Sequence, residues 1–123
     1  MSEGGRNRLE IGLNAAIVAV LGDVPAILTV GGGTDEALPF GPFDPVRHRT
    51  LEIGLRSWVE AQTALRLGYV EQLYTFGDRG RHEVNPGEGP RVVSVGYLAL
   101  VRAQDLPPAP ESHWQDWYTY FPW

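Results

Sequence analysis

The first third of the chain has the pattern of two paired strands. Two apolar runs rich in β-branched residues, IGLNAAIVAV and VPAILTV, are separated by the short turn sequence LGD. Such runs on either side of a glycine-containing turn are typical of antiparallel strands. The pattern therefore predicts a hairpin over about residues 12–30. Residues 1–10 before it are mostly polar and predict a flexible N-terminal segment.

The middle of the chain changes to helical spacing. From Thr50 onward no proline intervenes, and large side chains recur three or four positions apart. This spacing is typical of an amphipathic helix, which we expect over about residues 50–66. Gly54 lies inside it and costs about 1 kcal/mol relative to alanine. Its presence predicts that another segment of backbone passes close to the helix at that point.

Strand-like sequence returns after the helix. Residues 68–77, GYVEQLYTFG, contain several strand formers, and residues 91–101, RVVSVGYLALV, are almost continuously apolar. A strand with that continuous character is usually covered on both faces, so we expect residues 91–101 to form a central strand. Residues 31–37 and 78–90 read as loops. Strands, one helix and further strands predict an α+β domain with a mixed sheet.

Composition limits the classes of function. The 123 residues suffice for one domain, and the net charge of −5 argues against a free-standing nucleic-acid binder, because phosphate contacts need a basic surface. The chain has no cysteine, which removes disulfides, thiolate nucleophiles and cysteine-ligated zinc and fits a cytoplasmic location. No apolar run approaches the roughly 20 residues that cross a bilayer, so we expect no membrane partner.

Two short motifs flank the predicted helix. LPFG at residues 38–41 and AQTAL at residues 61–65 resemble the start and the end of the Nudix signature, Gly-x5-Glu-x7-Arg-Glu-U-x-Glu-Glu-x-Gly-U, where U is apolar. The resemblance covers about residues 10–105. It implies a Nudix-like α/β/α sandwich with a mixed sheet, occupying residues 11–106.

A narrower resemblance rests on the strands after the helix. LYTFGDRGR and RVVSVGYLALV are similar to the corresponding segments of Nudix-related transcriptional regulators of NAD metabolism. In these regulators a Nudix-like domain precedes a DNA-binding winged helix. The resemblance implies that an NAD-related nucleotide, such as ADP-ribose, is the small-molecule effector.

The signature is degenerate where a metal ion would bind. Glu52 and Glu60 are the only carboxylates of the helix, and at 1.5 Å per residue they lie about 12 Å apart. Mg²⁺ needs several oxygen ligands in near-octahedral geometry, so two such distant carboxylates do not easily share it. We therefore expect no catalytic residue and no metal. Counted against the signature, the positions of its glutamates and arginine hold other residues: Arg49, Ser57, Trp58, Ala61 and Gln62.

A binding surface can outlast a lost metal site if cations replace the metal. Arg79, Arg81 and Arg91 follow the predicted helix and could bind phosphate through the bidentate guanidinium. Phe76 and Tyr97 could stack on adenine. For the arginines the alternative is a solvated surface position, and for the two aromatic residues it is core packing.

The remaining histidines form no recognisable site. His48, His82 and His113 are scattered, without the spacing of a zinc motif, and are expected on the surface or in loops.

The last segment, residues 107–123, begins with PPAP and ends in a cluster of aromatic residues. Aromatic side chains are enriched at interfaces, so Trp114, Trp117 and Trp123 are candidates for a homodimer or domain interface. We expect the segment to lead into a downstream domain outside this chain. Packing of the tail across the sheet of its own domain is the alternative.

Three functions remain open at this stage. The first is a catalytically inactive effector-sensing domain of a transcriptional regulator, working as a homodimer and reaching DNA only through a further domain. The second is a divergent Nudix hydrolase that cleaves a nucleoside diphosphate derivative with Mg²⁺ or Mn²⁺. The third is a dimerisation module without a small ligand.

Overall fold

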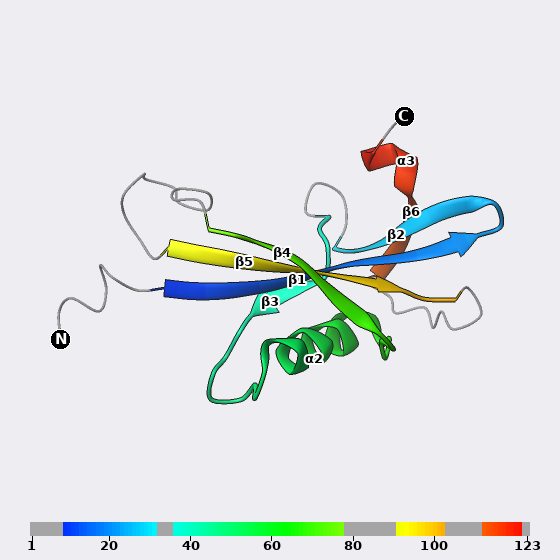
Figure 1. Cartoon of the computed structure of the whole chain (residues 1–123). Helices are drawn as coiled ribbons and strands as arrows, with labels where there is room; N and C mark the ends of the chain where they lie inside the picture. Colours follow the sequence, from blue (N-terminus) through cyan, green and yellow to red (C-terminus); the bar gives the residue numbers. More distant parts are fainter. Residues whose placement is uncertain (1–8, 32–35, 78–90, 103–111, 122–123) are drawn as a thin grey trace, which may run out of the picture.

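A computed structural model describes residues 9–31, 36–77, 91–102 and 112–121. In these ranges the chain forms a mixed sheet and two helices, which confirms the predicted α+β class (Figure 1). The elements in chain order are β1 (Leu9–Leu21), β2 (Val24–Val30), β3 (Phe40–Pro42), α2 (Leu51–Thr63), β4 (Val70–Phe76), β5 (Arg91–Leu100), β6 (Ser112–Asp116) and α3 (Trp117–Tyr120).

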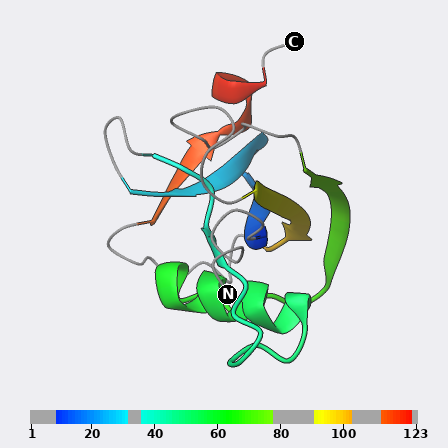
Figure 2. The same cartoon turned by 90° about the vertical axis from the view of Figure 1, so that its left-hand side faces the viewer.

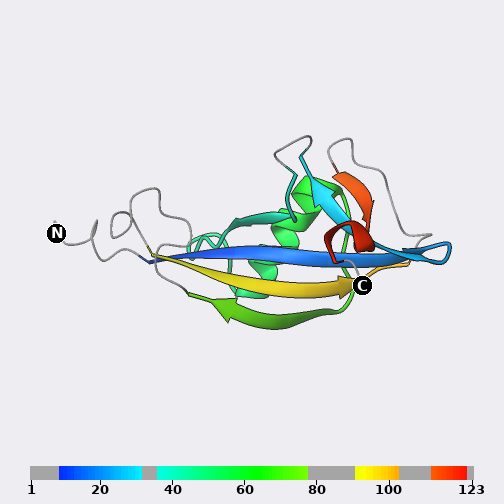
Figure 3. The same cartoon turned by 90° about the horizontal axis from the view of Figure 1, so that it is seen from above.

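The long strand β1 organises the sheet. The sheet has six strands in the order β4-β5-β1-β2-β6, and β3 pairs with the N-terminal half of β1. β1 and β5 run parallel from Leu9 opposite Arg91 to Val18 opposite Leu100, and the other pairings are antiparallel. Figure 3 shows β1 and β5 side by side, with β4 beyond β5. The prediction that β5 is an internal strand is therefore confirmed.

Each strand has two faces because successive side chains alternate. On β1, Leu13, Ala15 and Ile17 point into the core, where they meet Leu55 and Val59 of α2. The short helix α3 lies on the other side of the sheet from α2 (Figures 1 and 2). The order of layers is therefore helix, sheet, helix, with α2 as the main helix.

The predicted hairpin and main helix are both present, with small differences at their ends. β1 begins at Leu9, because the backbone of residues 9 and 10 pairs with β5 although these side chains are exposed. The expectation of a flexible segment up to residue 10 is thus wrong for its last two residues. Residues 1–8 lie outside the described ranges.

Local hydrogen bonds set the two ends of α2. The hydroxyl of Thr50 accepts a hydrogen bond from the backbone nitrogen of Ile53 at 3.0 Å, which caps the N-terminus. At the other end Ala64 adopts a left-handed conformation, with φ of 64°, and its backbone nitrogen donates to the carbonyl oxygen of Glu60. The helix therefore stops at Thr63 instead of reaching residue 66.

The end of the chain contains a strand that the sequence did not predict. β6 pairs antiparallel with β2, from Ala26 opposite Asp116 to Val30 opposite Ser112. Its five residues show no strong alternation, so only the pairing with β2 defines the strand. None of the helices in the described ranges is long and apolar enough to cross a membrane.

Candidate functional site

Trp58 of α2 holds the strand before the helix. Its indole Nε1 donates a hydrogen bond to the carbonyl oxygen of Pro42 at 2.8 Å. The ring also lies directly on Gly41, where an added Cβ would come within 2.3 Å of it. Only glycine fits beneath this indole. Trp58 is thus a packing residue that ties α2 to β3, at a position where the sequence resemblance implies a glutamate.

Gln62, one turn later on α2, makes a second tie to β3. Its side-chain oxygen accepts from the backbone nitrogen of Phe40 at 3.1 Å, and its side-chain nitrogen donates to the Phe40 carbonyl at 2.6 Å. The amide is suited to this pair because it carries both a donor and an acceptor, whereas an ionised carboxylate has only acceptors. Arg49, Ser57 and Ala61 are exposed.

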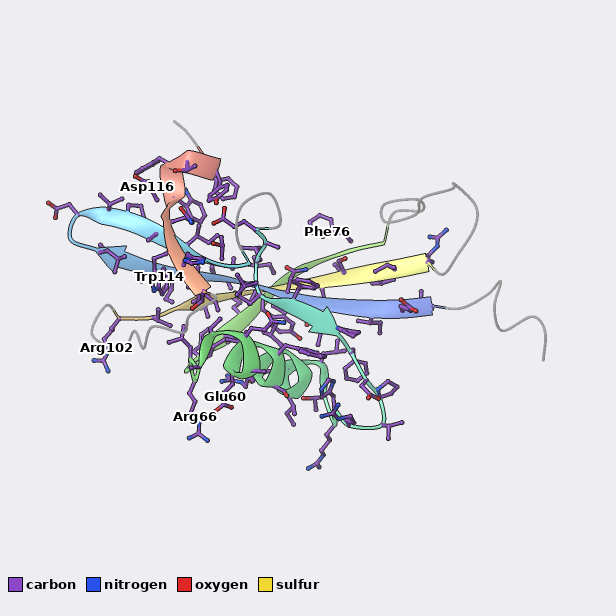
Figure 4. The ribbon with its side chains drawn as sticks, turned by 180° about the vertical axis from the view of Figure 1, so that it is seen from behind. Glu60, Arg66, Phe76, Arg102, Trp114 and Asp116 are labelled. Atoms are coloured by element: carbon purple, nitrogen blue, oxygen red, sulfur yellow. The ribbon has the colours of Figure 1, made fainter. Side chains whose placement is uncertain are left out.

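Both carboxylates of α2 are engaged by arginines of the same chain. Glu52 lies 3.0 Å from Arg56, and Glu60 lies 3.3 Å from Arg66. Figure 4 shows Glu60 and Arg66 together on the side of α2 away from the sheet. In the described part of the chain no three His, Cys, Asp or Glu residues gather closely enough to hold a metal ion.

Arg56 has a structural role that sequence reasoning missed. Besides Glu52, its guanidinium donates to the carbonyl oxygens of Leu67 at 2.5 Å and of Gly68 at 2.6 Å. These bonds fasten the segment after α2 to the middle of the helix. The two carbonyl partners lie 11 and 12 residues away in sequence, so helical spacing alone does not reveal them.

Gly54 is required by side chains, not by the passing backbone that the sequence suggested. A Cβ at Gly54 would lie 2.9 Å from Nδ1 of His48 and 3.0 Å from Leu13. His48 is in the loop before α2, as expected, but the residue is only 7% exposed, which the sequence did not predict. Its Nδ1 accepts a hydrogen bond from the backbone nitrogen of Asp44 at 3.0 Å, so this histidine organises the loop.

A large pocket opens on the side of the sheet opposite α2. Its volume is about 930 Å³, within the range usual for small-molecule sites. The strand residues Asn14, Ala16, Ser94 and Leu98 form its floor, and all of them alternate with residues of the core. The walls come from residues 36–40, from β4 and from the end of the chain, including Glu36, Phe40, Leu73, Phe76, Trp117, Tyr120 and Phe121.

Glu36 joins four segments at one wall of this pocket. Its carboxylate accepts hydrogen bonds from the Thr29 hydroxyl at 2.8 Å, the Gln115 amide at 2.6 Å and the Tyr120 hydroxyl at 2.5 Å. The bond from Tyr120, followed by that from Thr29, lowers the pKa of Glu36 below its ordinary value. The same contact raises the pKa of Tyr120. Glu36 is therefore ionised, and Tyr120 protonated, at neutral pH.

Sequence reasoning did not find Glu36. It lies in GGGTDEA, a segment interpreted only as a loop, and its partners Gln115 and Tyr120 are 79 and 84 residues away. An acidic residue between two apolar segments is the single signal that the sequence offers. The nearby helix α3 and the strand β6, which bring these partners to Glu36, were not predicted either.

The two predicted adenine-stacking residues lie on different faces of the sheet. Phe76 lines the pocket, and Figure 4 shows it on the side away from α2. Tyr97 also contributes to the lining, but it alternates with Gly96 and Leu98, is 4% exposed and belongs to the core under α2. Burial, with a smaller effect of the Glu52 charge, raises its pKa. This placement favours core packing for Tyr97.

The predicted phosphate-binding arginines are placed only in part. Arg91 is exposed at the start of β5 and donates to the carbonyl oxygen of Gly77 at 3.1 Å, beside Phe76. Arg79 and Arg81 lie outside the described residues, as does His82.

The aromatic tail packs largely on its own domain. Trp114 is half-buried against the core, and Trp117 stacks on Phe121 with ring centroids 4.4 Å apart at the pocket wall. His113 is exposed on β6, whereas Trp123 lies outside the described residues. Intramolecular packing, one of the two alternatives for the tail, therefore occupies both described tryptophans.

Comparison of the fold with solved structures identifies its class: the chain has the Nudix fold. Neither a scan against protein-family models nor a search of curated proteins finds a match, so the sequence alone does not establish a family. The structural similarity is nevertheless extensive. One example is the Nudix domain of Shewanella oneidensis NrtR in complex with ADP-ribose, with a TM-score of 0.72 and 21% identity over 90% of this chain and 75% of that chain.

Two further structures extend the comparison. Crystalline Shewanella oneidensis NrtR matches with a TM-score of 0.75 and 21% identity, over 91% of this chain but 54% of its own length. This chain thus spans about half of that protein. The Caenorhabditis elegans Ap4A hydrolase matches with a TM-score of 0.61 and 11% identity, over 88% of this chain and 80% of that one.

Proposed function

We propose that this domain binds an NAD-related nucleotide such as ADP-ribose without cleaving it, as the effector-sensing domain of a transcriptional regulator of NAD metabolism. One observation carries the proposal. At the helix positions where a Nudix hydrolase has metal-binding glutamates, Trp58 and Gln62 bond to the backbone of β3, while a pocket of about 930 Å³ remains open across the sheet.

Hydrolysis of a diphosphate by this fold would need carboxylates gathered around a metal ion. Glu52 and Glu60 point to separate arginine partners, Arg56 and Arg66. Recruiting both for one ion would break two ion pairs and still leave the ion short of ligands. The chemistry of the helix therefore favours binding over cleavage.

The likeness to NrtR supports the choice of ligand. The Nudix domain of Shewanella oneidensis NrtR was crystallised with ADP-ribose, and NrtR itself with a 27mer DNA. In our proposal this chain provides the sensing part, and DNA is contacted through a domain outside it. The charge of −5 fits a domain that stays away from DNA phosphates.

The proposal includes a homodimer that works in the cytoplasm. Regulators that read pseudo-palindromic DNA sites are dimers, and their two-fold symmetry matches that of the site. Trp123 and the exposed faces of the tail are the candidate contacts, since Trp114 and Trp117 pack within the domain. Light scattering at high protein concentration tests this point: we expect twice the mass of one chain, and a monomer would contradict it.

A divergent hydrolase is the second candidate. The observation that supports this candidate is the similarity of the fold to that of the Caenorhabditis elegans Ap4A hydrolase. The two candidates differ in whether the bound nucleotide is consumed and whether a divalent metal is needed.

Calorimetry and product analysis separate these candidates. ADP-ribose, NAD and NMN are titrated in Mg²⁺, in Mn²⁺ and in chelator, and each mixture is then analysed for cleavage. We expect metal-independent binding of ADP-ribose without turnover, whereas metal-dependent turnover would support the hydrolase. If none of these compounds binds, the remaining function is a dimerisation module without a small ligand.

A matched pair of variants tests the location of the site. Ala16→Phe adds a ring to the pocket floor, and Ala61→Phe adds the same ring to the exposed side of α2. We expect the first to abolish binding and the second to leave it unchanged. Loss of binding in the second variant alone would place the ligand at the helix.

A further inference from the structure

The pocket has an uneven distribution of charge. Of the lining residues that the structure describes, Glu36 alone is charged, and most of the remainder are apolar or aromatic. In such surroundings a carboxylate repels anions more strongly than it would in water. A phosphate group therefore does not bind beside Glu36 without a cation between them.

Glu36 still has room to accept a hydrogen bond. A carboxylate has about four acceptor positions, two on each oxygen. Thr29 and Gln115 donate to Oε2, and Tyr120 donates to Oε1. Among the described residues, three donors are thus used, and one position on Oε1 remains. A neutral donor on a ligand, such as an amine or a hydroxyl, fits this position.

The opposite end of the pocket has different chemistry. In the order of the strands, β2 and the Glu36 cluster lie on one side of β1, whereas β5 and β4 lie on the other. Phe76 of β4 pairs with Ser94 of β5 there, and both line the pocket. Arg91 precedes Ser94 on the same strand and is bonded to Gly77, the residue after Phe76. The positive charge of Arg91 therefore lies at the start of β5, on this end of the sheet but beyond the described lining of the pocket.

We infer that Glu36 is a specificity-determining residue that accepts a hydrogen bond from the nucleoside end of the ligand, and that the phosphates lie toward β4 and β5, which places Phe76 near the phosphates instead of on the adenine. This inference rests on the proposed function, since it assigns an orientation to the nucleotide in that pocket. The shared chemistry is a neutral hydrogen-bond donor, which is either the exocyclic amine of adenine or a ribose hydroxyl.

Two variants at one hydrogen bond test the role of Glu36. Glu36→Gln removes the charge at nearly constant size, and Tyr120→Phe removes the neighbouring donor while leaving the carboxylate. Because a hydrogen bond to a charged group is worth more than a neutral one, we expect Glu36→Gln to weaken ADP-ribose binding about tenfold. Tyr120→Phe alters a residue of the pocket wall but keeps the carboxylate of Glu36, so it should weaken binding less than Glu36→Gln does.

Other ligands locate the donor. Replacing adenine by hypoxanthine substitutes a carbonyl for the amine. If the wild-type domain binds this analogue more weakly than ADP-ribose, as Glu36→Gln binds ADP-ribose, the donor is the amine. If the affinity for the analogue is unchanged, the donor is a ribose hydroxyl. Either result agrees with the inference. Inorganic pyrophosphate, which has no nucleoside, should bind Glu36→Gln no more weakly than wild type.

Three results would overturn the inference. The first is ADP-ribose binding that survives Glu36→Gln, which would refute the role of Glu36 and leave the proposed function intact. The second is an equal loss in Tyr120→Phe, which would show that Glu36 acts only by holding α3. The third is a wild-type domain that does not bind ADP-ribose, which would reject the proposed function and this inference together.

Discussion

The two sides of the sheet use polar side chains in opposite ways. On the side of α2, Trp58 and Gln62 form their hydrogen bonds with the backbone of β3. Arg56 donates to backbone carbonyls of the segment after the helix. On the other side, Glu36 and Tyr120 meet at the wall of an open pocket. The polar groups on the first side are bonded within the domain, whereas those on the second side line a pocket that is open to a ligand.

Under the proposed function, this difference explains how α2 keeps its place in the fold without metal chemistry. A glutamate on α2 would serve a metal but offers no donor to a backbone carbonyl. Tryptophan and glutamine supply donors, and the tryptophan also covers Gly41. The helix thereby gains contacts that hold the fold, and in the proposed function the ligand binds on the opposite side of the sheet.

The largest effect on stability is expected from introducing glutamates at three positions of α2. Trp58→Glu, Ala61→Glu and Gln62→Glu together remove the indole packing and the donors to β3, so we expect the free energy of unfolding to fall by about 3 kcal/mol or more. We also expect no efficient Mg²⁺-dependent cleavage of ADP-ribose. Thermal unfolding and product analysis measure the two effects.

Ser57→Glu is the control for added charge, because Ser57 is exposed on the same helix. Its stability should stay within about 0.5 kcal/mol of wild type. Efficient cleavage by the triple variant would show that α2 can still form a metal site. It would contradict a purely structural role for the α2 side of the sheet.

A methyl group at residue 41 should have the next largest effect. In Gly41→Ala the new Cβ would lie 2.3 Å from the Trp58 ring, so the indole or β3 must move. We expect a loss of about 2 kcal/mol in unfolding free energy by chemical denaturation. In a background of Trp58→Ala the same change should cost much less. Equal costs in both backgrounds would mean that the indole does not press on β3.

The two arginines that pair with the helix carboxylates should differ. Arg56→Ala loses two bonds to backbone carbonyls as well as the pair with Glu52, and should cost about 1–2 kcal/mol. Arg66→Ala loses only an exposed pair with Glu60 and should cost under about 0.5 kcal/mol. Denaturant titrations of both variants measure this difference, and similar losses would show that the bonds to Leu67 and Gly68 add little.

The smallest effect concerns pH on the pocket side. The lowered pKa of Glu36 means that its contribution to stability is present above its ordinary value of 4.5 and is lost as pH falls through the lower folded value. Besides Tyr120, Thr29 and Gln115, His113 also acts on this carboxylate through its charge. We expect Trp117 fluorescence to report release of α3 in that acid range.

Tyr120→Phe should move this acid transition to higher pH, because the bond from Tyr120 is the main cause of the lowered pKa. Tyr120 has the opposite pH dependence, because its pKa is raised. Its contribution to stability is present below the ordinary pKa of 10.0 and is lost as pH rises through the higher pKa of the folded state. An unchanged acid transition in the variant would contradict the assigned contact.

The sequence predicted those elements whose pattern is local. The hairpin, the main helix and β5 follow from periodicity and composition, and all three are present. The end of α2 was missed because the left-handed Ala64 is not a residue type that usually marks a helix end. β6 was missed because its only strong reason to be extended is β2, which lies more than 80 residues earlier.

The candidate sites show the same limit more sharply. The motif implies that Trp58 and Gln62 stand at positions of signature glutamates, and this stays a prediction. Their bonds to Phe40 and Pro42 could not be predicted from the motif. Phe76 could be proposed for the ligand, yet only the sheet register separates it from Tyr97. Glu36 was missed because its three donors come from segments brought together by the fold.

Nitrogen-15 spectra of the tryptophan indoles during titration with ADP-ribose in the presence of Mg²⁺ test the account most directly. Trp117 lies at the pocket wall, and the indole nitrogen of Trp58 lies 2.8 Å from the Pro42 carbonyl on the opposite side of the sheet. We predict that the Trp117 signal moves with added nucleotide and that the Trp58 signal stays in place, with the nucleotide intact at the end. A moving Trp58 signal beside a stationary Trp117 signal would contradict the account.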